Sequence, residues 1–592
     1  MANDKKLIIP PMSTNLDGPV AGPGITPPPE HLVRKAGTAI PMIPEPLPVV
    51  AMPGANTTPP PDMTKPPQQI MAEDELNPWP LPEGTVIPDG ISPIQLGIYR
   101  QLVQDSTKIE WLVQGCSDSG NALRLRDLLG DSPEGGQPVP HKLMRWSYDI
   151  DRGTWLIWDG KWWVRDTTER VILLAQDMIV DLRKRSKFLE EVCFTMGDVP
   201  RGKQMSKVTS FFNLSLSKNS LRSMIELAKP LLNAPASLFD QNPLLLSCTN
   251  GTINLASGEL QPHNYSDWIT RGVHVAYVPN AVSPEWASVV NHVANYDPEV
   301  VDYLQVAAGY SITGSTQEKK IFLLHGDTNT GKSLFINTLG SVMGSYASSG
   351  SFTSLAAKSR EEGGPRSDIA RWESKRLVYI SEVWGGRRWD SQMVKNVTGA
   401  TDRLVVAYKF KTEREFRPTF KIWVACNDVP KADHDDSGMW ARIDRVPVGP
   451  TIERAAIDQR LDVKLASPCG QQSVLAWAVA GAVKWVAQGL TTPAVIEAAT
   501  EEYRDESNPV KTFADNYVEF GPRCQCTSSD IFLSYTRFCK YTGERNPMSH
   551  NKLMRSLVKL HPELEPYRTM LDRGWVGLYC NPAHIEGQLR GE

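Results

Sequence analysis

A glycine-rich segment near the middle of the chain has the residue types and the spacing that phosphate binding requires. Residues 326–333 read GDTNTGKS, which fits the pattern G-x-x-x-x-G-K-[ST]. In this pattern backbone N–H groups cradle the phosphates of a nucleotide, the lysine reaches the β- and γ-phosphates, and the hydroxyl binds Mg²⁺. The expected ATP-binding residues are Gly326, Asp327, Thr328, Asn329, Thr330, Gly331, Lys332 and Ser333. Lys332 is also expected to be catalytic, and Ser333 to hold Mg²⁺ together with ATP.

Two polar residues that end apolar runs are candidates for the chemistry of hydrolysis. Glu382 follows the run 376–381, which we expect to form a strand beside the strand of the loop. A carboxylate in that place can deprotonate the attacking water and assist the Mg²⁺ site. Asn427 lies in the segment FKIWVACNDVP, at the expected tip of a third strand, where its amide can position the same water. The alternative for Glu382 is a solvated acid at a strand end.

Two arginines follow Trp440 in the segment DDSGMWARIDRVPV. An arginine that stabilises charge developing on the γ-phosphate is often delivered by a neighbouring subunit. We favour Arg442 for this catalytic role, with Arg445 as the alternative. Either arginine can instead form a structural ion pair.

A basic segment between the second and third expected strands is a candidate DNA contact. The alternating stretches 404–408 and 415–420 flank KFKTER, which predicts a β-hairpin with Lys409 and Lys411 near its tip. Lysines at such a tip can follow the phosphates of a single DNA strand without reading its sequence. The alternative is an ordinary solvated turn.

These candidates depend on a strand–loop–helix unit that presents the loop. Residues 321–324 form a short continuous apolar run, as expected of a strand buried on both faces. Residues 334–344 have helical spacing and end at Gly340 and Gly344. The positive end of the helix dipole would then face the phosphates.

The segments before this unit have different compositions. The first 90 residues contain 21 of the 46 prolines and should be disordered or extended, as a tether or as a docking tail for replication proteins. Residues 91–280 read as an α+β module with a tryptophan-rich hairpin at 153–166, whose tryptophans are most simply core. Asp149 and Asp151 have the spacing of a two-metal site, but we favour a polar edge before the hairpin.

The C-terminal residues 506–592 read as a separate small domain. A capped amphipathic helix at 528–543, a second helix starting after Ser549 and a hairpin turning at 572–574 form a winged-helix pattern. Lys552 and Arg555 on the second helix are the expected DNA-binding residues of this domain. The alternative is a protein-interaction or ring-stabilising role.

Composition indicates the compartment of the protein and the distribution of its charge. The formal net charge of −4 gives no global sign of a nucleic-acid binder, so any basic surface must be local. Cys524 and Cys526 are the only close cysteine pair, without the spacing of a zinc site, and sparse cysteines suit a reducing compartment. The apolar run 474–487 is too short to span a bilayer. We therefore expect a soluble, cytoplasmic protein with no membrane partner.

The sequence resembles the superfamily 3 helicases, and most closely the phage and plasmid primase–helicase type related to the poxvirus replication helicase. The resemblance rests on GDTNTGKS, KRLVYISE, KNVTGATD, FKIWVACNDVP and WARI, which occur in the family's order, and it covers roughly residues 150–520. It implies an AAA+-type ATPase that forms a ring, usually a hexamer, on single-stranded or forked DNA and moves 3′ to 5′. It also implies that Lys395, Thr398, Gly399 and Asp402 belong to an extra motif before the DNA-facing hairpin.

The expected fold class is therefore α/β, with a P-loop AAA+-type core. The expected divisions are a Pro-rich tail (1–90), an N-terminal α+β domain (91–280), the ATPase domain (281–505) and a winged-helix domain (506–592). Ser381 stands where many such motors have a first acid. Larger family members carry a primase domain ahead of the motor, whereas here about 60 ordered residues follow the tail, so we do not expect priming.

The expected function is an ATP-dependent replicative DNA helicase of a phage, plasmid or similar mobile element. Two alternatives stay open: an origin-binding initiator regulated by ATP, and an NTPase that loads another helicase.

Overall fold

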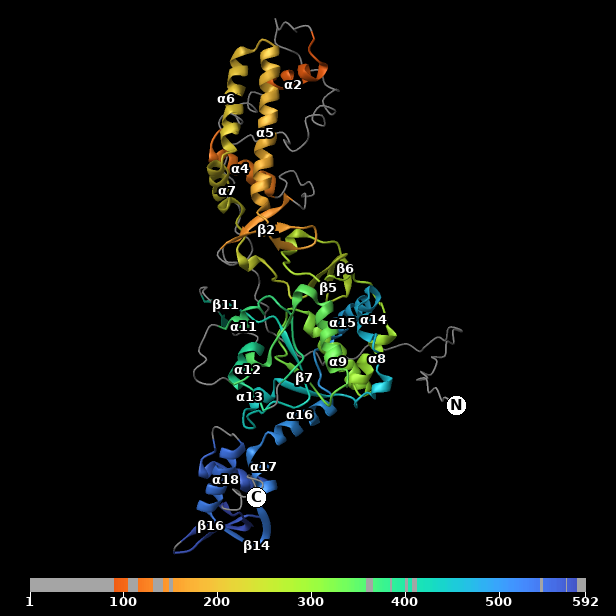
Figure 1. The fold of residues 1–592 in the computed structure, drawn as a ribbon, viewed down its shortest axis with the longest axis vertical. Coiled ribbons are helices and arrows are strands. Elements are labelled where there is room, and N and C mark those ends of the chain that lie inside the picture. Colours follow the sequence, from red (N-terminus) through yellow and green to blue (C-terminus); the bar gives the residue numbers. More distant parts are fainter. Residues whose placement is uncertain are drawn as a thin grey trace, which may run out of the picture. The chain divides into compact units, whose positions relative to one another are not determined.

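The computed structural model describes residues 90–104, 115–130, 142–147, 153–357, 366–383, 386–399, 403–406, 413–542, 547–570 and 572–582 (Figure 1). The chain divides into two units, Met1–Pro61 and Asp62–Glu592, and all described residues belong to the second. Outside the described part lie residues 1–89, Asp149, Asp151, Asp402, Lys409 and Lys411. What the sequence indicates for them stays a prediction.

A mixed α/β fold with a parallel sheet forms the middle of the chain. Its strands are β7 (Ile321–His325), β8 (Ala347–Ser349), β9 (Leu377–Ile380), β12 (Lys421–Cys426) and β13 (Ile443–Pro447). They are ordered β13-β7-β12-β9-β8, and every neighbouring pair is parallel. β7 sends Phe322 and Leu324 into one hydrophobic cluster and Ile321 and Leu323 into another. The prediction of a strand buried on both faces is confirmed.

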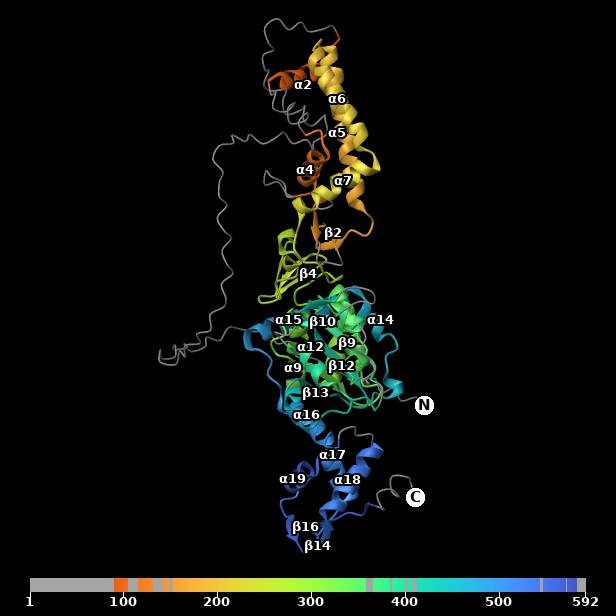
Figure 2. The ribbon, with the colours of Figure 1, turned by 90° about the vertical axis from the view of Figure 1, so that its left-hand side faces the viewer.

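Helices cover both faces of this sheet (Figure 1), and Figure 2 shows the same part of the chain turned by 90°. One hydrophobic cluster includes residues of α8 (Pro284–Val293), α9 (Pro298–Ile312), α10 (Lys332–Val342), α14 (Leu461–Ala466) and α15 (Pro468–Gln488). The other includes residues of α11 (Ser367–Ala370), α12 (Ser391–Thr398), α13 (Ser437–Trp440) and α16 (Ala494–Glu506). The apolar run 474–487 lies within α15 and supplies core side chains, as its composition predicts.

One expectation about the sheet is wrong. β9, which ends just before Glu382, does not pair with β7, because β12 lies between them. Parallel strands are joined by crossovers, and such strands do not have to pair in chain order. Asn427 therefore follows β12, the strand that pairs with β7. Glu382 follows β9, which is separated from β7 by β12.

Helices dominate the first described segments. They are α2 (Pro93–Gln104), α4 (Asp118–Leu129), α5 (Arg170–Thr195), α6 (Val199–Ser215) and α7 (Lys218–Ala228). Ala175, Ile179 and Leu182 recur along one face of α5 and join the same hydrophobic cluster as Phe212 of α6. Apolar residues at helical spacing predict helices over 168–192 and 218–232, where α5 and α7 form. The same spacing predicts no helix for α6, which begins at an Asp198 cap that accepts a hydrogen bond from the Arg201 backbone N–H at 3.3 Å.

Two small antiparallel sheets accompany these helices. β1 (Met144–Ser147), β2 (Thr154–Trp158) and β3 (Trp163–Arg165) form one, and β4 (Leu245–Cys248), β5 (Gly251–Asn254) and β6 (Glu259–Gln261) the other. The predicted hairpin at 153–166 is confirmed, because β2 and β3 pair antiparallel and the Asp159 carboxylate between them accepts hydrogen bonds from the backbone N–H groups of Lys161 and Trp162 at 2.8 and 2.9 Å. Trp155, Trp158 and Trp163 are buried core residues, also as predicted.

The C-terminal segment combines helices with a three-stranded antiparallel sheet. Its elements are α17 (Pro509–Tyr517), β14 (Glu519–Thr527), α18 (Ser528–Thr542), α19 (His550–Leu560), β15 (Glu565–Arg568) and β16 (Arg573–Tyr579), with the sheet order β14-β16-β15. The predicted helix, helix and hairpin are present, and α17 and β14 precede them. The predicted turn at 572–574 is misplaced, because Arg573 and Gly574 already belong to β16 and pair with β15.

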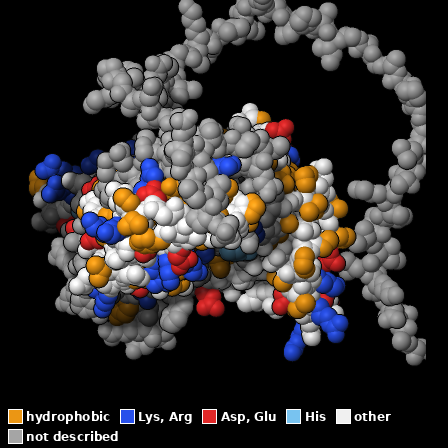
Figure 3. Space-filling model, turned by 90° about the horizontal axis from the view of Figure 1, so that it is seen from above, with side chains coloured by type: hydrophobic (Ala, Val, Ile, Leu, Met, Phe, Trp, Pro, Cys, Tyr) orange, Lys and Arg blue, Asp and Glu red, His pale blue; other side chains and the backbone are white. Residues whose placement is uncertain are grey.

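Charges of both signs are mixed among the described residues of one face of the molecule. On the face drawn in Figure 3, Lys and Arg side chains alternate with Asp and Glu and with hydrophobic side chains, in keeping with the small net charge. Among the helices that the structure describes, each is too short or too polar to cross a bilayer.

Candidate functional site

The loop between β7 and α10 has backbone angles that few residue types adopt without strain. Asn329 and Gly331 have positive φ angles of 58° and 81°, and Gly331 is the N-cap of α10. Glycine adopts this region without strain, and asparagine tolerates it better than most residues. Gly326 is also needed, since a Cβ atom there would lie 2.4 Å from the Val448 side chain. The loop therefore curls tightly around the start of α10.

Lys332 is held inside this loop. Its ammonium donates hydrogen bonds to the carbonyl oxygens of Gly326 at 2.7 Å and Asp327 at 2.5 Å, and to the Thr330 hydroxyl at 3.0 Å. The residue is only 5% exposed, and burial lowers the pKa of its ammonium. These contacts fix the positive charge at the concave side of the loop, where phosphate oxygens would meet it.

One cavity of about 570 Å³ joins the loop to the ends of β9 and β12. Its lining residues are Thr328, Asn329, Thr330, Gly331, Lys332, Ser333, Leu334, Ser381, Glu382, Val383, Ala425, Cys426, Asn427 and Asp428. The carboxyl ends of parallel strands meet at the same edge of a sheet, which explains why distant parts of the sequence converge here. Lys332, Ser333, Glu382 and Asn427 are thus brought together.

Three further residues of this cavity matter for its chemistry. Asp428, which no sequence pattern indicates, places a second exposed carboxylate in the lining beside Asn427. Ser381 donates a hydrogen bond to the Asn337 side chain at 3.4 Å. Burial raises the pKa of the Cys426 thiol to about 12, so this thiol stays protonated and is no nucleophile at neutral pH.

The two candidate arginines occupy very different places. Arg445 is 7% exposed, and its guanidinium contacts the His325 ring at 3.1 Å, the Ala499 carbonyl oxygen at 3.2 Å and Glu502 at 3.1 Å. Burial and the Arg445 charge lower the pKa of His325, which leaves a neutral ring to accept this bond. Arg445 is therefore committed to internal contacts.

Arg442 lies at the amino-terminal ends of the sheet strands, whereas the loop at 326–331 follows the carboxyl end of β7. It immediately precedes β13, whose first residue pairs with Ile321 at the start of β7, whereas Pro447 pairs with His325 next to the loop. Its guanidinium donates to the Gly438 carbonyl oxygen through Nη1, and its Nε has no partner among the described residues. Arg442 is thus remote from the phosphates that its own chain would bind.

The expected DNA-contacting segment is described only at its base. β10 (Leu404–Val406) and β11 (Arg414–Phe416) pair antiparallel, which confirms a hairpin, while Lys409 and Lys411 lie outside the described residues. Lys395, on α12 before this hairpin, forms an ion pair with Asp436 at 2.6 Å. Thr398 closes the same helix by donating to the Val394 carbonyl oxygen at 2.6 Å.

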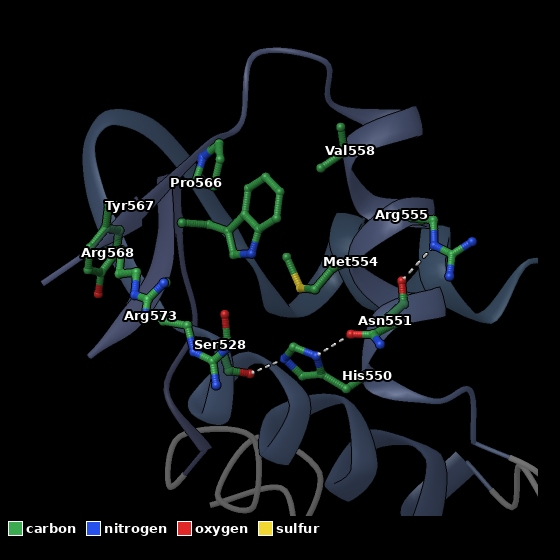
Figure 4. Close-up of a pocket in the computed structure, with 12 residues that line it drawn as sticks. Ser528, His550, Asn551, Met554, Arg555, Val558, Pro566, Tyr567, Arg568 and Arg573 are labelled. Atoms are coloured by element: carbon green, nitrogen blue, oxygen red, sulfur yellow. Dashed lines mark hydrogen bonds between the residues drawn. The ribbon is translucent and has the colours of Figure 1, made fainter. Parts of the chain in front are cut away.

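The two DNA-binding candidates of the C-terminal segment differ in their surroundings. Lys552 forms an ion pair with Asp435, just before α13. Arg555, one turn further along α19, lines a groove of about 740 Å³ beside the β15–β16 hairpin (Figure 4). Of the two, only Arg555 is among the residues that line this groove, and its guanidinium is bonded back to the Asn551 carbonyl oxygen on the outer side of α19 (Figure 4).

Comparisons with known proteins place these features in a viral context. A family described as "D5 N terminal like" matches residues 124–294, and a family of unknown function matches residues 324–445. A protein of Acanthamoeba polyphaga mimivirus named as a helicase is 20% identical over 297 residues, which is 47% of this chain and 31% of that protein. Similarly named proteins are 22% identical in Invertebrate iridescent virus 6 (38% of this chain, 24% of that protein) and 24% identical in Frog virus 3 (40% and 26%).

These matches support a primase–helicase family of the poxvirus-like type. The matched region is about a third or less of the length of each viral relative. Among solved structures, an apo structure of the NrS-1 C-terminal region covers 56% of this chain and 73% of that chain, with 14% identity and a TM-score of 0.32. A TM-score this low supports no conclusion about function.

Proposed function

We propose that this chain is an ATP-dependent DNA helicase that serves the replication of a virus or of another mobile element such as a phage or plasmid. The observation that carries the proposal is the single cavity lined by Lys332, Ser333, Glu382 and Asn427. Together these residues supply a phosphate cradle, a metal ligand, a base for water and an amide to align it. The viral relatives named as helicases support DNA unwinding as the work that hydrolysis drives.

Each side chain has a distinct role in the proposed hydrolysis. Lys332 exchanges its loop carbonyl contacts for oxygens of the β- and γ-phosphates, while backbone N–H groups at the start of α10 bind the remaining oxygens. Glu382 takes a proton from the attacking water, and Asn427 holds that water in line with the γ-phosphate. The products are ADP and inorganic phosphate.

The donor groups of the cavity also suit Mg²⁺. An exposed Ser333 hydroxyl at the helix start and the Glu382 carboxylate line the same wall, and Asp428 adds a second carboxylate. Hard oxygen ligands of this kind are those that Mg²⁺ prefers when it binds with a nucleotide. Asp428 thus compensates for Ser381, which stands where many such motors have an acid. Bound Mg²⁺ would neutralise charge on the phosphates.

The proposed assembly is a ring, usually a hexamer in the family that the sequence resembles, which encircles one strand and moves 3′ to 5′. ATP would bind between subunits, with Arg442 of one subunit facing the cavity of the next. The remoteness of Arg442 from its own loop supports this arrangement. The proposed partners are single-stranded and forked DNA, origin DNA, and replication proteins at the Pro-rich tail.

Replacing Lys409 and Lys411 together by alanine tests the proposed coupling between hydrolysis and DNA. We expect the ratio of DNA-stimulated to unstimulated hydrolysis to approach one, because the phosphate contacts that couple the strand to the motor are lost. Phosphate release is measured with and without a single-stranded oligonucleotide. Lys464→Ala combined with Lys484→Ala removes the same charge from exposed helix positions and should keep the stimulation. Wild-type stimulation in the Lys409/Lys411 variant would refute the role of this hairpin.

A further inference from the structure

A groove lies between α19 and the β15–β16 hairpin (Figure 4), and none of its residues has a role in the proposed hydrolysis. Its volume is about 740 Å³, within the usual range for a ligand site. The lining residues are Ser528, His550, Asn551, Met554, Arg555, Val558, Pro566, Tyr567, Arg568, Arg573, Gly574 and Trp575. One wall is the helix, and the other wall is the hairpin.

The charge of this groove differs from that of the whole chain. Three lining residues are arginines and none is acidic, although the chain has a formal net charge of −4. Arg568 and Arg573 are paired directly across the hairpin, and like charges in that position destabilise a β-ladder. Among the described residues, no carboxylate forms an ion pair with Arg555, Arg568 or Arg573; Arg555 donates only to the Asn551 carbonyl oxygen, at 3.3 Å. An anionic ligand would relieve this repulsion.

Flat apolar and aromatic side chains lie between these charges. Trp575 is half-buried and packs against the hydrophobic core of the segment, which fixes its ring. The Tyr567 ring crosses Gly574, where an added Cβ atom would lie 2.5 Å from that ring. Tyr567 is paired with Gly574, one position away from the pair of Pro566 and Trp575, so the tyrosine lies on the opposite face of the hairpin and Trp575 is the aromatic surface of the groove. Rigid aromatic surfaces flanked by cations are what stacking of unpaired bases requires.

We propose that this groove binds a single strand of nucleic acid, with a base stacked on Trp575 and phosphates held by Arg568 and Arg573, which share its face of the hairpin. Stacking needs an exposed base face, which a paired duplex keeps inside its own stack, so the aromatic lining favours a single strand. This site does not include Lys552, which the sequence indicates as a DNA contact of α19 and which forms an ion pair with Asp435. Binding here requires neither ATP nor the hydrolytic cavity.

The test uses the full chain without ATP, in a Lys409→Ala, Lys411→Ala background that removes the other proposed strand contact. Binding of a fluorescent oligothymidylate is followed by anisotropy at several salt concentrations. Trp575→Ala should weaken binding about 5- to 140-fold, the usual effect of losing one stacked base, while Trp575→Phe keeps most of the affinity. Arg568→Gln combined with Arg573→Gln should reduce the slope of log K against log salt by about 1.4, or about 0.7 per lost phosphate contact.

The control removes equal charge elsewhere in the same segment. Arg523→Gln combined with Lys540→Gln changes exposed residues outside the groove and should keep the affinity and the salt slope. Arg568 and Arg573 are exposed, so their variant stays informative even if Trp575→Ala unfolds the segment, which thermal unfolding would reveal. An unchanged salt slope in the double arginine variant would overturn the proposal. Tighter binding of a matched duplex than of the single strand would also overturn it.

Discussion

Replacing Lys332 by alanine is expected to lower ATP hydrolysis at least about 100-fold, the scale of losing one preorganised charge from a transition state. Lys332 is 5% exposed and its ammonium is bound to two loop carbonyl oxygens and the Thr330 hydroxyl, so its position is set before a nucleotide arrives. Among the residues that the structure describes, no other lysine or arginine lines the cavity. The measurement is phosphate release at saturating ATP and Mg²⁺.

Stability must be measured on the same variant. The carbonyl groups that lose their Lys332 partner belong to Gly326, which is half-buried, and Asp327, which is exposed, so water can hydrate both. We therefore expect thermal unfolding close to that of the unchanged protein. Lys484→Ala, which removes an exposed ion pair with Asp302, serves as the matched control and should leave hydrolysis unchanged. Turnover within a few-fold of normal in a folded Lys332→Ala protein would refute the hydrolytic site.

Replacing Arg442 by alanine is expected to lower hydrolysis about 10³-fold or more, the range for losing an arginine that acts from a neighbouring subunit. β13 has five residues and separates Arg442 from the loop edge, a distance of roughly 16 Å at about 3.3 Å per residue. A guanidinium at that distance cannot reach phosphates bound by its own chain. Arg442 would have to act on another subunit.

Mixing two inactive variants tests this directly. Glu382→Gln should lower hydrolysis about 10²- to 10⁴-fold through loss of the general base. In an equal mixture with Arg442→Ala, about a quarter of the interfaces of a ring combine an intact Glu382 with an intact Arg442, so up to about a quarter of normal hydrolysis should return. Arg445→Ala in place of Arg442→Ala should give no rescue, because every contact of Arg445 is internal. Absence of rescue with Arg442→Ala would assign that arginine a structural role.

Much of the hydrolytic cavity could be predicted from the sequence because its determinants are local. The loop pattern, the apolar run of β7 and polar residues at strand ends such as Asn427 all follow from short-range chemistry. The convergence of these strand ends follows from the geometry of parallel sheets alone. Glu382 therefore reaches the cavity even though its strand was expected in the wrong position.

The remaining features depend on contacts between distant parts of the chain. The position of β12 between β7 and β9 is set by tertiary packing, which no short pattern records. Helix α6 was missed because Pro200 and Gly202 weaken its helical signal, although proline is tolerated in a first turn and Asp198 caps the helix. Arg445 became a structural residue only through His325 and Glu502, which are far away in sequence.

Strand displacement tests the proposed motor most directly. A duplex with a single-stranded 3′ tail is incubated with the full chain, Mg²⁺ and ATP, and release of the labelled strand is followed over time. We expect release that requires ATP hydrolysis, fails with a 5′ tail and is lost in Lys332→Ala and Arg442→Ala. ATP-dependent binding to duplex DNA without strand release would contradict the helicase assignment and indicate an origin-binding initiator instead.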